Sequence, residues 1–457
     1  MKTATAVVLC AAIALCTLAL GAQRTISGAT RSPISVAAVG SPRFHTVYIR
    51  LGSKNDEGLL YEPTSHRFRS RIALLFSHTD GNTFNYPIAK QMAIRGYRIL
   101  MVNHHGPEVG LWAYAPGISW GIRYLRSLRG VRRVVIVGHS GGAPLMAFYA
   151  NVAAHGPAAC AGAQKLYPCP ASGLIGLARP DGVILLDPPL GAFHAMSSID
   201  PAVRGNNPKS RIPALDMFAA ANGFNAATGA ARYSAAFARQ FYAAQAARNA
   251  RILDRALARL HAIEHGESHF RDDEPLVVPG MGMYAAGARL YDPDPFAFLS
   301  HTRTPHLLLE PDGRTAQEIV WSIRPPLGAY VHDLDTLNVM TQETTVRRFL
   351  ANYAIRTTSR YAITADDILG VDWNSAATST PSNAEGISVP TLVMVMTCHY
   401  FVVSGEIVYD HLATDDKTYA AVQGATHMFT PCGREYGDTV KTTFDFVNAW
   451  LSKPGRF

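Results

Sequence analysis

Short apolar runs alternate with amphipathic stretches over the first half of the chain, and this alternation limits the possible folds most strongly. Each apolar run predicts a strand buried on both faces, and each intervening stretch has the spacing of a helix. The predicted strands are 71–78, 97–104, 133–138 and 182–191, and the predicted helices are 85–96, 117–130 and 143–156. This order is typical of an α/β fold with a doubly wound, mostly parallel sheet that helices cover on both sides.

The alternation stops near residue 195 and resumes near residue 386. A long Ala- and Arg-rich stretch, 233–266, has helical spacing and lies within the interruption. We therefore expect a core in two parts, 42–195 and 386–457, separated by a mainly helical insertion, 196–385. Ligands of doubly wound sheets bind beyond the carboxyl ends of the strands, so an insertion that leaves from such an end would cover the site as a lid.

The first residues have the pattern of a secretory signal peptide. One lysine precedes an apolar run, and small residues follow it in "MKTATAVVLCAAIALCTLALGAQ". This pattern predicts a signal peptide over 1–22, a secreted or periplasmic protein, and no stable membrane insertion after the signal is removed.

Of the six cysteines, Cys10 and Cys16 lie in this predicted signal. The other four are Cys160, Cys169, Cys398 and Cys432. An even number of cysteines in an oxidising compartment favours disulfides, and proximity in the sequence favours Cys160–Cys169, which leaves Cys398–Cys432. Free buried cysteines are the alternative. The absence of a CxxC motif argues against a zinc site.

The formal net charge of +8 does not by itself indicate a nucleic-acid partner. Arg and Lys are scattered, and the densest group, "RYLRSLRGVRR" at 123–133, is consistent with one exposed helix face and the turn after it. A nucleic-acid-binding protein would concentrate its basic residues in a patch or stripe. We therefore expect no nucleic-acid partner. The sequence leaves the oligomeric state open.

One serine stands where a predicted strand turns sharply into a predicted helix. The stretch "VVIVGHSGGAPLMAFYA", residues 134–150, places Ser140 in a G-x-S-x-G motif between the strand and the helix. This context is that of a nucleophile elbow, in which a strained turn presents the serine hydroxyl at the carboxyl edge of the sheet. The amide of Gly141, at the start of the helix, can stabilise an oxyanion.

With this motif in this context, the sequence resembles the α/β-hydrolase superfamily over about 44–191 and 389–457. The resemblance implies a serine nucleophile, then an acidic residue, then a histidine base after the last strand. His427 follows the predicted strand 417–424 in "YAAVQGATHMFTPC" and is the candidate base. Cys398–Cys432 would tie the loop that carries His427 to the loop after Met396.

The acidic member has two candidates. The family's commonest acid position, a few residues after Met396, is occupied here by His399. Asp187 stands at the end of the strand predicted within 182–191, where some lipases of this fold carry their acid, and it is preferred. Glu406 is the alternative, with helix capping as its structural role.

The second oxyanion donor is expected in the loop after the first core strand. The stretch "FSHTDGN", residues 76–82, resembles the family's His-Gly loop, but Thr79 stands where a glycine is usual. A backbone amide of Thr79 or Asp80 is therefore the candidate.

These features predict a serine hydrolase that cleaves small to medium, moderately apolar carboxylic esters through an acyl-enzyme. No cofactor and no metal is implied. One alternative is an amidase or peptidase on the same scaffold, for which the acidic stretch "HFRDDEP", residues 269–275, is a candidate α-amino receptor. A hydrolase-like binding protein without catalysis is the other alternative.

Overall fold

The computed structural model describes residues 43–52, 56–65, 71–79, 81–104, 109–282, 289–327 and 341–457. The predicted signal peptide, 1–22, and Asp80 lie outside the described residues. No helix among the described residues is both long enough and apolar enough to cross a membrane.

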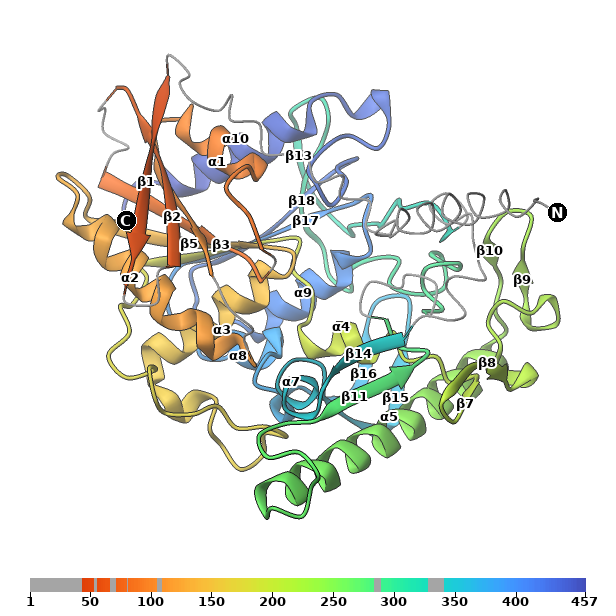
Figure 1. Ribbon diagram of the computed structural model, residues 1–457. Helices are drawn as coiled ribbons and strands as arrows, with labels where there is room; N and C mark the ends of the chain where they lie inside the picture. Colours follow the sequence, from red (N-terminus) through yellow and green to blue (C-terminus); the bar gives the residue numbers. More distant parts are fainter. Residues whose placement is uncertain are drawn as a thin grey trace, which may run out of the picture. The chain divides into compact units, whose positions relative to one another are not determined.

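A ten-stranded sheet forms the centre of the fold (Figure 1). Its strands, in spatial order, are β1 (Phe44–Leu51), β2 (Asp56–Pro63), β4 (Arg98–Asn103), β3 (Ile72–Ser77), β5 (Arg133–His139), β6 (Gly182–Leu186), β17 (Thr391–Met396), β18 (Lys417–Val422), β12 (His306–Leu309) and β13 (Thr315–Glu318). The strands from β4 to β12 pair in parallel, whereas β1, β2 and β13 are antiparallel to their neighbours. The predicted doubly wound, mostly parallel sheet is confirmed.

Helices cover both faces of this sheet because its central strands are apolar on both sides. In β3, Leu74 and Phe76 belong to a buried cluster with α1 (Pro87–Ala93) and α10 (Thr439–Leu451). Leu75 points the other way, into a cluster with α2 (Ala115–Ser127), α3 (Gly142–His155) and α9 (Phe401–His411). Successive strand residues alternate between the faces, so one apolar run supplies two cores.

The interval 196–385 contains both helices and strands. Its helices among the described residues are α5 (Ala235–Glu264), α7 (Val346–Asn352) and α8 (Thr380–Ala384), and α4 (Ala192–Met196) ends where the interval begins. Its antiparallel pairs are β7 (Val203–Arg204) with β8 (Asn207–Arg211), β9 (Phe224–Asn225) with β10 (Ala230–Ala231), β11 (Pro275–Pro279) with β14 (Thr341–Thr345), and β15 (Arg356–Ile363) with β16 (Ile368–Asp372). Short 3₁₀ turns lie within this interval at Pro213–Leu215, Ala220–Asn222 and Trp373–Ser375, and outside it at Leu111–Tyr114, Pro157–Ala159 and Arg434–Tyr436.

Two strands of this interval, β12 and β13, belong to the central sheet rather than to a separate layer. β12 pairs in parallel with β18, and β13 closes that edge of the sheet. The sequence pattern gave no sign of this extension, because each of these strands is only four residues long. The division into a core, 42–195 and 386–457, and a lid, 196–385, is therefore still a proposal.

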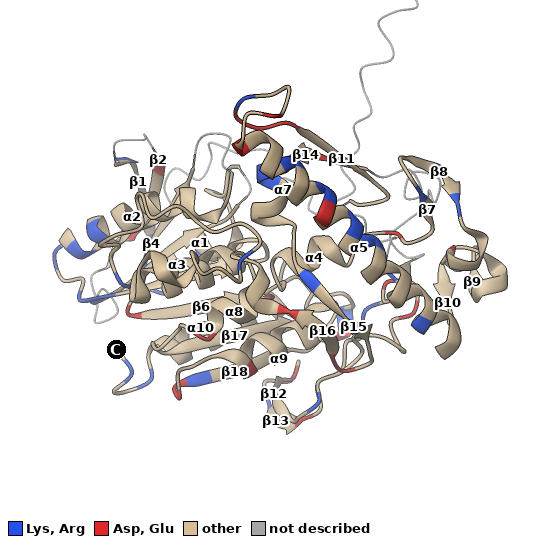
Figure 2. Ribbon diagram, turned by 90° about the horizontal axis from the view of Figure 1, so that it is seen from below, with Lys and Arg blue, Asp and Glu red and all other residues tan. Residues whose placement is uncertain are grey.

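The long helix α5 packs one face into the core and leaves the other in solvent. Ser234 caps its first turn by accepting a hydrogen bond from the Phe237 amide. Phe237 and Phe241 join the same buried cluster as α2, α3 and α9. Figure 2 shows Lys and Arg along α5, on α7 and on α2, spread over several elements.

Candidate active site

The turn between β5 and α3 holds Ser140 in a strained backbone conformation. Ser140 has φ of 51°, in the left-handed region that side-chain-bearing residues rarely adopt. The turn also requires glycine at its flanks. A Cβ atom on Gly138 would lie 2.2 Å from the carbonyl oxygen of Gly142, and one on Gly142 would lie 2.5 Å from that of Ser77. The G-x-S-x-G motif thus meets a steric need.

Asp187 stands beside this turn at the end of the neighbouring strand, β6. The Ser140 amide donates a hydrogen bond of 3.1 Å to the carbonyl of Leu186, the residue before Asp187. Asp187 is fully buried and also has a positive φ, 47°. Its amide donates to the carbonyl of Met394 on β17 at 2.6 Å. Two adjacent strands therefore end in strained residues whose backbones are linked.

His427 reaches the Asp187 carboxylate from the loop after β18. Its Nδ1 lies 2.5 Å from Oδ2 of Asp187, whose Oδ1 accepts from the Met396 amide at 3.1 Å. The His427 side chain is 27% exposed although Asp187 is fully buried, so the imidazole connects the buried carboxylate to solvent. Of the residues expected from the sequence, the structure brings Asp187 and His427 into direct contact.

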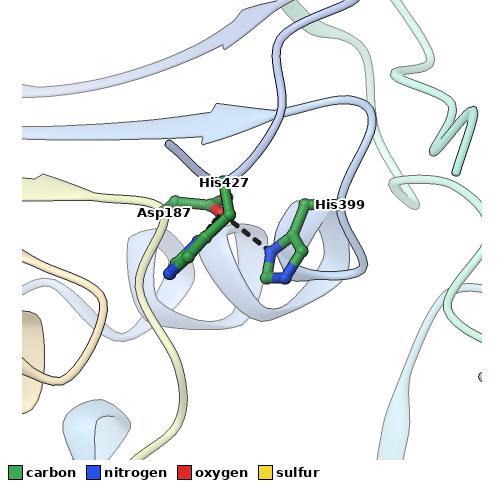
Figure 3. Close-up of side chains that lie close together, drawn as sticks. All are labelled: Asp187, His399 and His427. Carbon is green, nitrogen blue, oxygen red and sulfur yellow. Dashed lines mark hydrogen bonds and ion pairs between the residues drawn. The ribbon is translucent and has the colours of Figure 1, made fainter. Parts of the chain in front are cut away.

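A second histidine, His399, contacts the same carboxylate oxygen (Figure 3). Its Nδ1 lies 2.8 Å from Oδ2 of Asp187, and its ring stacks on that of His427 with centroids 4.4 Å apart. Burial by itself would raise the pKa of Asp187. The hydrogen bonds and charges of His399 and His427 outweigh this effect and hold the pKa below its usual range.

His139, which precedes the serine, supports the loop that carries His427. It is buried, and its Nε2–H donates to the carbonyl oxygen of His427 at 2.8 Å. Burial holds the pKa of His139 well below its ordinary value, so the ring is neutral. Sequence reasoning missed this role, because it depends on a contact between residues nearly three hundred positions apart.

The loop that carries His427 is closed by a disulfide and by backbone hydrogen bonds. Cys398 is joined to Cys432, and the Cys398 amide donates to Ala425 at 2.9 Å. Cys432 in turn donates its amide to Gly424 at 2.8 Å. The other disulfide, Cys160–Cys169, lies in the excursion between α3 and β6. These are the two pairs expected from the cysteine spacing.

Glu406, the other candidate acid, lies in α9 and has different partners from Asp187. Its oxygens accept from the amides of Arg303 and Thr304 at 2.8 and 3.0 Å, and from Nε2 of His306 at 3.0 Å. Our expectation that Glu406 begins a helix is wrong, because α9 starts five residues earlier, at Phe401. The apolar residues of the first turn of α9 are buried, and their burial extends the helix beyond its polar boundary signal.

The loop after β3 packs against the elbow. A Cβ atom on Gly141 would lie 2.8 Å from Oγ1 of Thr79 and 3.1 Å from Cε1 of His78. Thr79, the first of the two expected oxyanion donors, is therefore next to the residue that follows Ser140. Asp80, the second, lies outside the described residues.

Asp187, His399 and His427 are also close enough together to be considered as metal ligands, with their ligand atoms within 4.8 Å of one another. However, the two rings are stacked, with an angle of 30° between their planes. The in-plane lone pairs of the two nitrogens would therefore run side by side rather than converge on one metal ion. Both Nδ1 atoms are also in contact with Oδ2. We therefore interpret the cluster as one carboxylate shared by two imidazoles.

Comparisons with known proteins find structures with similar folds. No protein-family model matches the chain, and no curated protein matches it significantly. Among solved structures, Est1E from Butyrivibrio proteoclasticus is 10% identical, with 89% of this chain and 99% of that chain covered and a TM-score of 0.36. Carboxyl esterase 2 from the fungus Tuber melanosporum is 11% identical, with 93% and 89% covered and a TM-score of 0.40. A bacterial membrane phospholipase A is 12% identical, with 90% and 86% covered and a TM-score of 0.34.

The assignment of the fold depends on the chain itself. The sheet is large and mostly parallel, helices cover both of its faces, and a G-x-S-x-G elbow joins β5 to α3. The chain therefore has the fold of the α/β-hydrolase superfamily.

Proposed function

We propose that the protein is a serine hydrolase that cleaves carboxylic esters, with Ser140, His427 and Asp187 as its catalytic triad. The observation that carries the proposal is the 2.5 Å contact between His427 Nδ1 and the buried Asp187 carboxylate, at the end of the strand next to the Ser140 elbow. A carboxylate in this position orients the imidazole and stabilises the imidazolium that forms during the reaction.

In this mechanism the Ser140 hydroxyl attacks the ester carbonyl, and Nε2 of His427 takes its proton. The negative charge on the carbonyl oxygen is stabilised by the amide of Gly141 and by that of Thr79 or Asp80. His427 then gives the proton to the departing alcohol, which leaves an acyl group on Ser140. Water, deprotonated by His427, releases the acid and restores the serine.

Two exposed apolar side chains favour a moderately apolar substrate. The segment 321–324 runs beside the loop after β17. The Ile323 amide donates to the carbonyl of Thr397 at 2.7 Å, and Ser322 Oγ donates to the carbonyl of His399 at 2.8 Å. Trp321 in this segment is 56% exposed and Ile323 is 38% exposed. An apolar acyl or alcohol group bound near His399 would cover them.

The amidase alternative gains nothing from the acidic stretch 269–275. Asp273 accepts the amide of Arg347 at 3.1 Å, and Glu274 is paired with Arg259. These carboxylates are engaged with the protein's own cations and amides. The cysteine pairs and the N-terminal pattern support a secreted or periplasmic location as part of the proposal.

The test is covalent labelling together with hydrolysis. A fluorophosphonate probe should label the wild-type protein at Ser140, and p-nitrophenyl esters should be hydrolysed faster than aminoacyl anilides. Ser140→Ala should abolish both labelling and hydrolysis, whereas Ser127→Ala, on the exposed end of α2, should change neither. Labelling that persists in Ser140→Ala would place the nucleophile elsewhere and contradict the proposal.

A further inference from the structure

The Asp187 carboxylate contacts two imidazoles, although the proposed reaction needs only one. His427 alone would supply the base, yet His399 approaches the same oxygen, Oδ2, at 2.8 Å (Figure 3). The two rings come from different loops, after β17 and after β18. Position 399 follows the strand next to β6, so the side chains at 187 and 399 meet at one edge of the sheet.

The backbone of His399 is anchored on both sides. Its amide donates to the carbonyl of Met396 at 3.0 Å, and its own carbonyl accepts from Ser322 Oγ at 2.8 Å. The ring lies against Phe401, with centroids 4.4 Å apart, and against His427. Only 19% of the side chain is exposed. The imidazole is therefore held against the carboxylate by packing and by its anchored backbone.

The protonation state of His399 follows from its surroundings. Burial lowers the pKa of His399 to about 4, although Asp187 opposes this shift; His427 and Arg324 also disfavour a second positive charge. His194, which faces the same cluster from α4, is kept neutral by burial, which holds its pKa well below the ordinary value. We infer that this neutral imidazole carries its proton on Nδ1, 2.8 Å from the carboxylate oxygen, since two facing lone pairs would repel each other.

We propose that His399 is a positioning residue for the acid of the triad: its ring, packed with Nδ1 2.8 Å from Oδ2 of Asp187, keeps the carboxylate in place and offsets part of its negative charge. This inference rests on the proposed function. The shared charge has a consequence for the base. Because Oδ2 faces two imidazoles, each of them interacts with less of its charge than it would with the carboxylate to itself.

Removing His399 should therefore strengthen the interaction of the carboxylate with His427 and should loosen the carboxylate. His399→Leu and His399→Asn form a matched pair, because the two new side chains have nearly the same shape and only the asparagine has an N–H where Nδ1 was. In His399→Leu we expect kcat to fall about tenfold with KM changed less than about twofold. We also expect the acidic limb of the kcat/KM profile to move up by about half a pH unit.

His399→Asn should restore kcat to within about threefold of the wild type and return the acidic limb to its original pH. Thermal melting of both variants controls for folding. A His399→Leu variant with the wild-type profile would overturn the inference. Equal losses in both variants with an unmoved acidic limb would also overturn it, since they would indicate packing alone.

A measurement on the unmodified protein tests the same point without any assay of hydrolysis. In the wild type labelled with ¹⁵N-histidine, NMR should show both His399 and His427 protonated on Nδ1 at neutral pH. An unprotonated Nδ1 on His399 would overturn the inference even if the enzyme is active. Failure of the proposed function would look different, because Ser140 of the wild-type protein would then react with neither fluorophosphonate nor esters.

Discussion

Asp187 and Glu406 are two buried carboxylates in different regions of one fold, and they have much in common. Both accept backbone amides, both contact a histidine, and both have a pKa below the ordinary value. In each case burial alone would raise the pKa. The charges and hydrogen bonds of His399 and His427 reverse that effect at Asp187, and hydrogen bonds from His306 and from the amides of Arg303 and Thr304 reverse it at Glu406. Charge state alone therefore does not separate the acid that we propose for the triad from the other buried carboxylate.

The two carboxylates differ in the exposure and the surroundings of the histidine that each one contacts. His306, the partner of Glu406, is 9% exposed and stacks on Tyr419 inside the core. His427, the partner of Asp187, is 27% exposed and lies beside the turn that holds Ser140. Glu406 ties the chain entering β12 to α9, whereas Asp187 faces the edge of the sheet at which its strand ends. A carboxylate–histidine pair can serve catalysis only when the imidazole also reaches a place where substrate can bind.

The largest effect should come from removing the charge of Asp187. Asp187→Asn keeps the size of the side chain but replaces an acceptor of His427 Nδ1–H by an amide, which favours the wrong imidazole tautomer. We expect kcat for ester hydrolysis to fall about 10⁴-fold, with the protein still folded. Steady-state kinetics with a p-nitrophenyl ester, beside thermal melting, measure both quantities. A loss of less than tenfold would show that another group acts as the acid.

The matched change in the other region, Glu406→Gln, should act on stability. The amide nitrogen of glutamine would face the donors of Arg303, Thr304 and His306, which now share the two carboxylate oxygens. We expect the free energy of unfolding to fall by about 2–4 kcal/mol while kcat of the folded protein stays within about threefold. Denaturant unfolding and kinetics at low temperature check this result. A selective loss of kcat in a stable variant would reverse the roles of the two carboxylates.

A further effect, seen only on changing the pH, is a pH dependence of stability that belongs to the Asp187 region. Burial lowers the pKa of His139, His194 and His399, so these groups take up protons in the unfolded chain near pH ~6.5 and in the folded protein only at lower pH. Below about pH 6.5 the unfolded state therefore binds more protons, and the free energy of unfolding should fall as the pH falls towards 4. The slope for each histidine is at most about 1.4 kcal/mol per pH unit.

Asp187 contributes in the same direction but only at lower pH, because its lowered pKa stabilises the fold above the ordinary aspartate range. Denaturant unfolding at several pH values between 7 and 4.5 measures the slope. His399→Asn should reduce it, since one of the three groups is gone. A slope unchanged in this variant would show that the pKa of His399 is not lowered in the folded protein, and a flat slope in the wild type would show the same of all three histidines.

Much of the fold follows from patterns within single segments. The strands 72–77, 98–103 and 133–139 and the helices after them could be predicted because each apolar run is continuous and each helix ends at or near a glycine. β12 and β13 could not be predicted, since four-residue strands carry almost no periodic signal and their place depends on pairing with β18 and with each other. The start of α9 was misplaced for a similar reason: burial against the sheet extends the helix.

The sequence by itself determined that Ser140 lies on a sharp strand-to-helix turn, because the glycines and the apolar run that define this turn are local. It also pointed to His427, Asp187 and the cysteine pairs as candidates. Only the tertiary structure decided which carboxylate meets the imidazole, and that a second histidine shares it. Asp187, His399 and His427 come from three strand ends, and the distances between their side chains follow from the order and register of β6, β17 and β18, which no single segment contains.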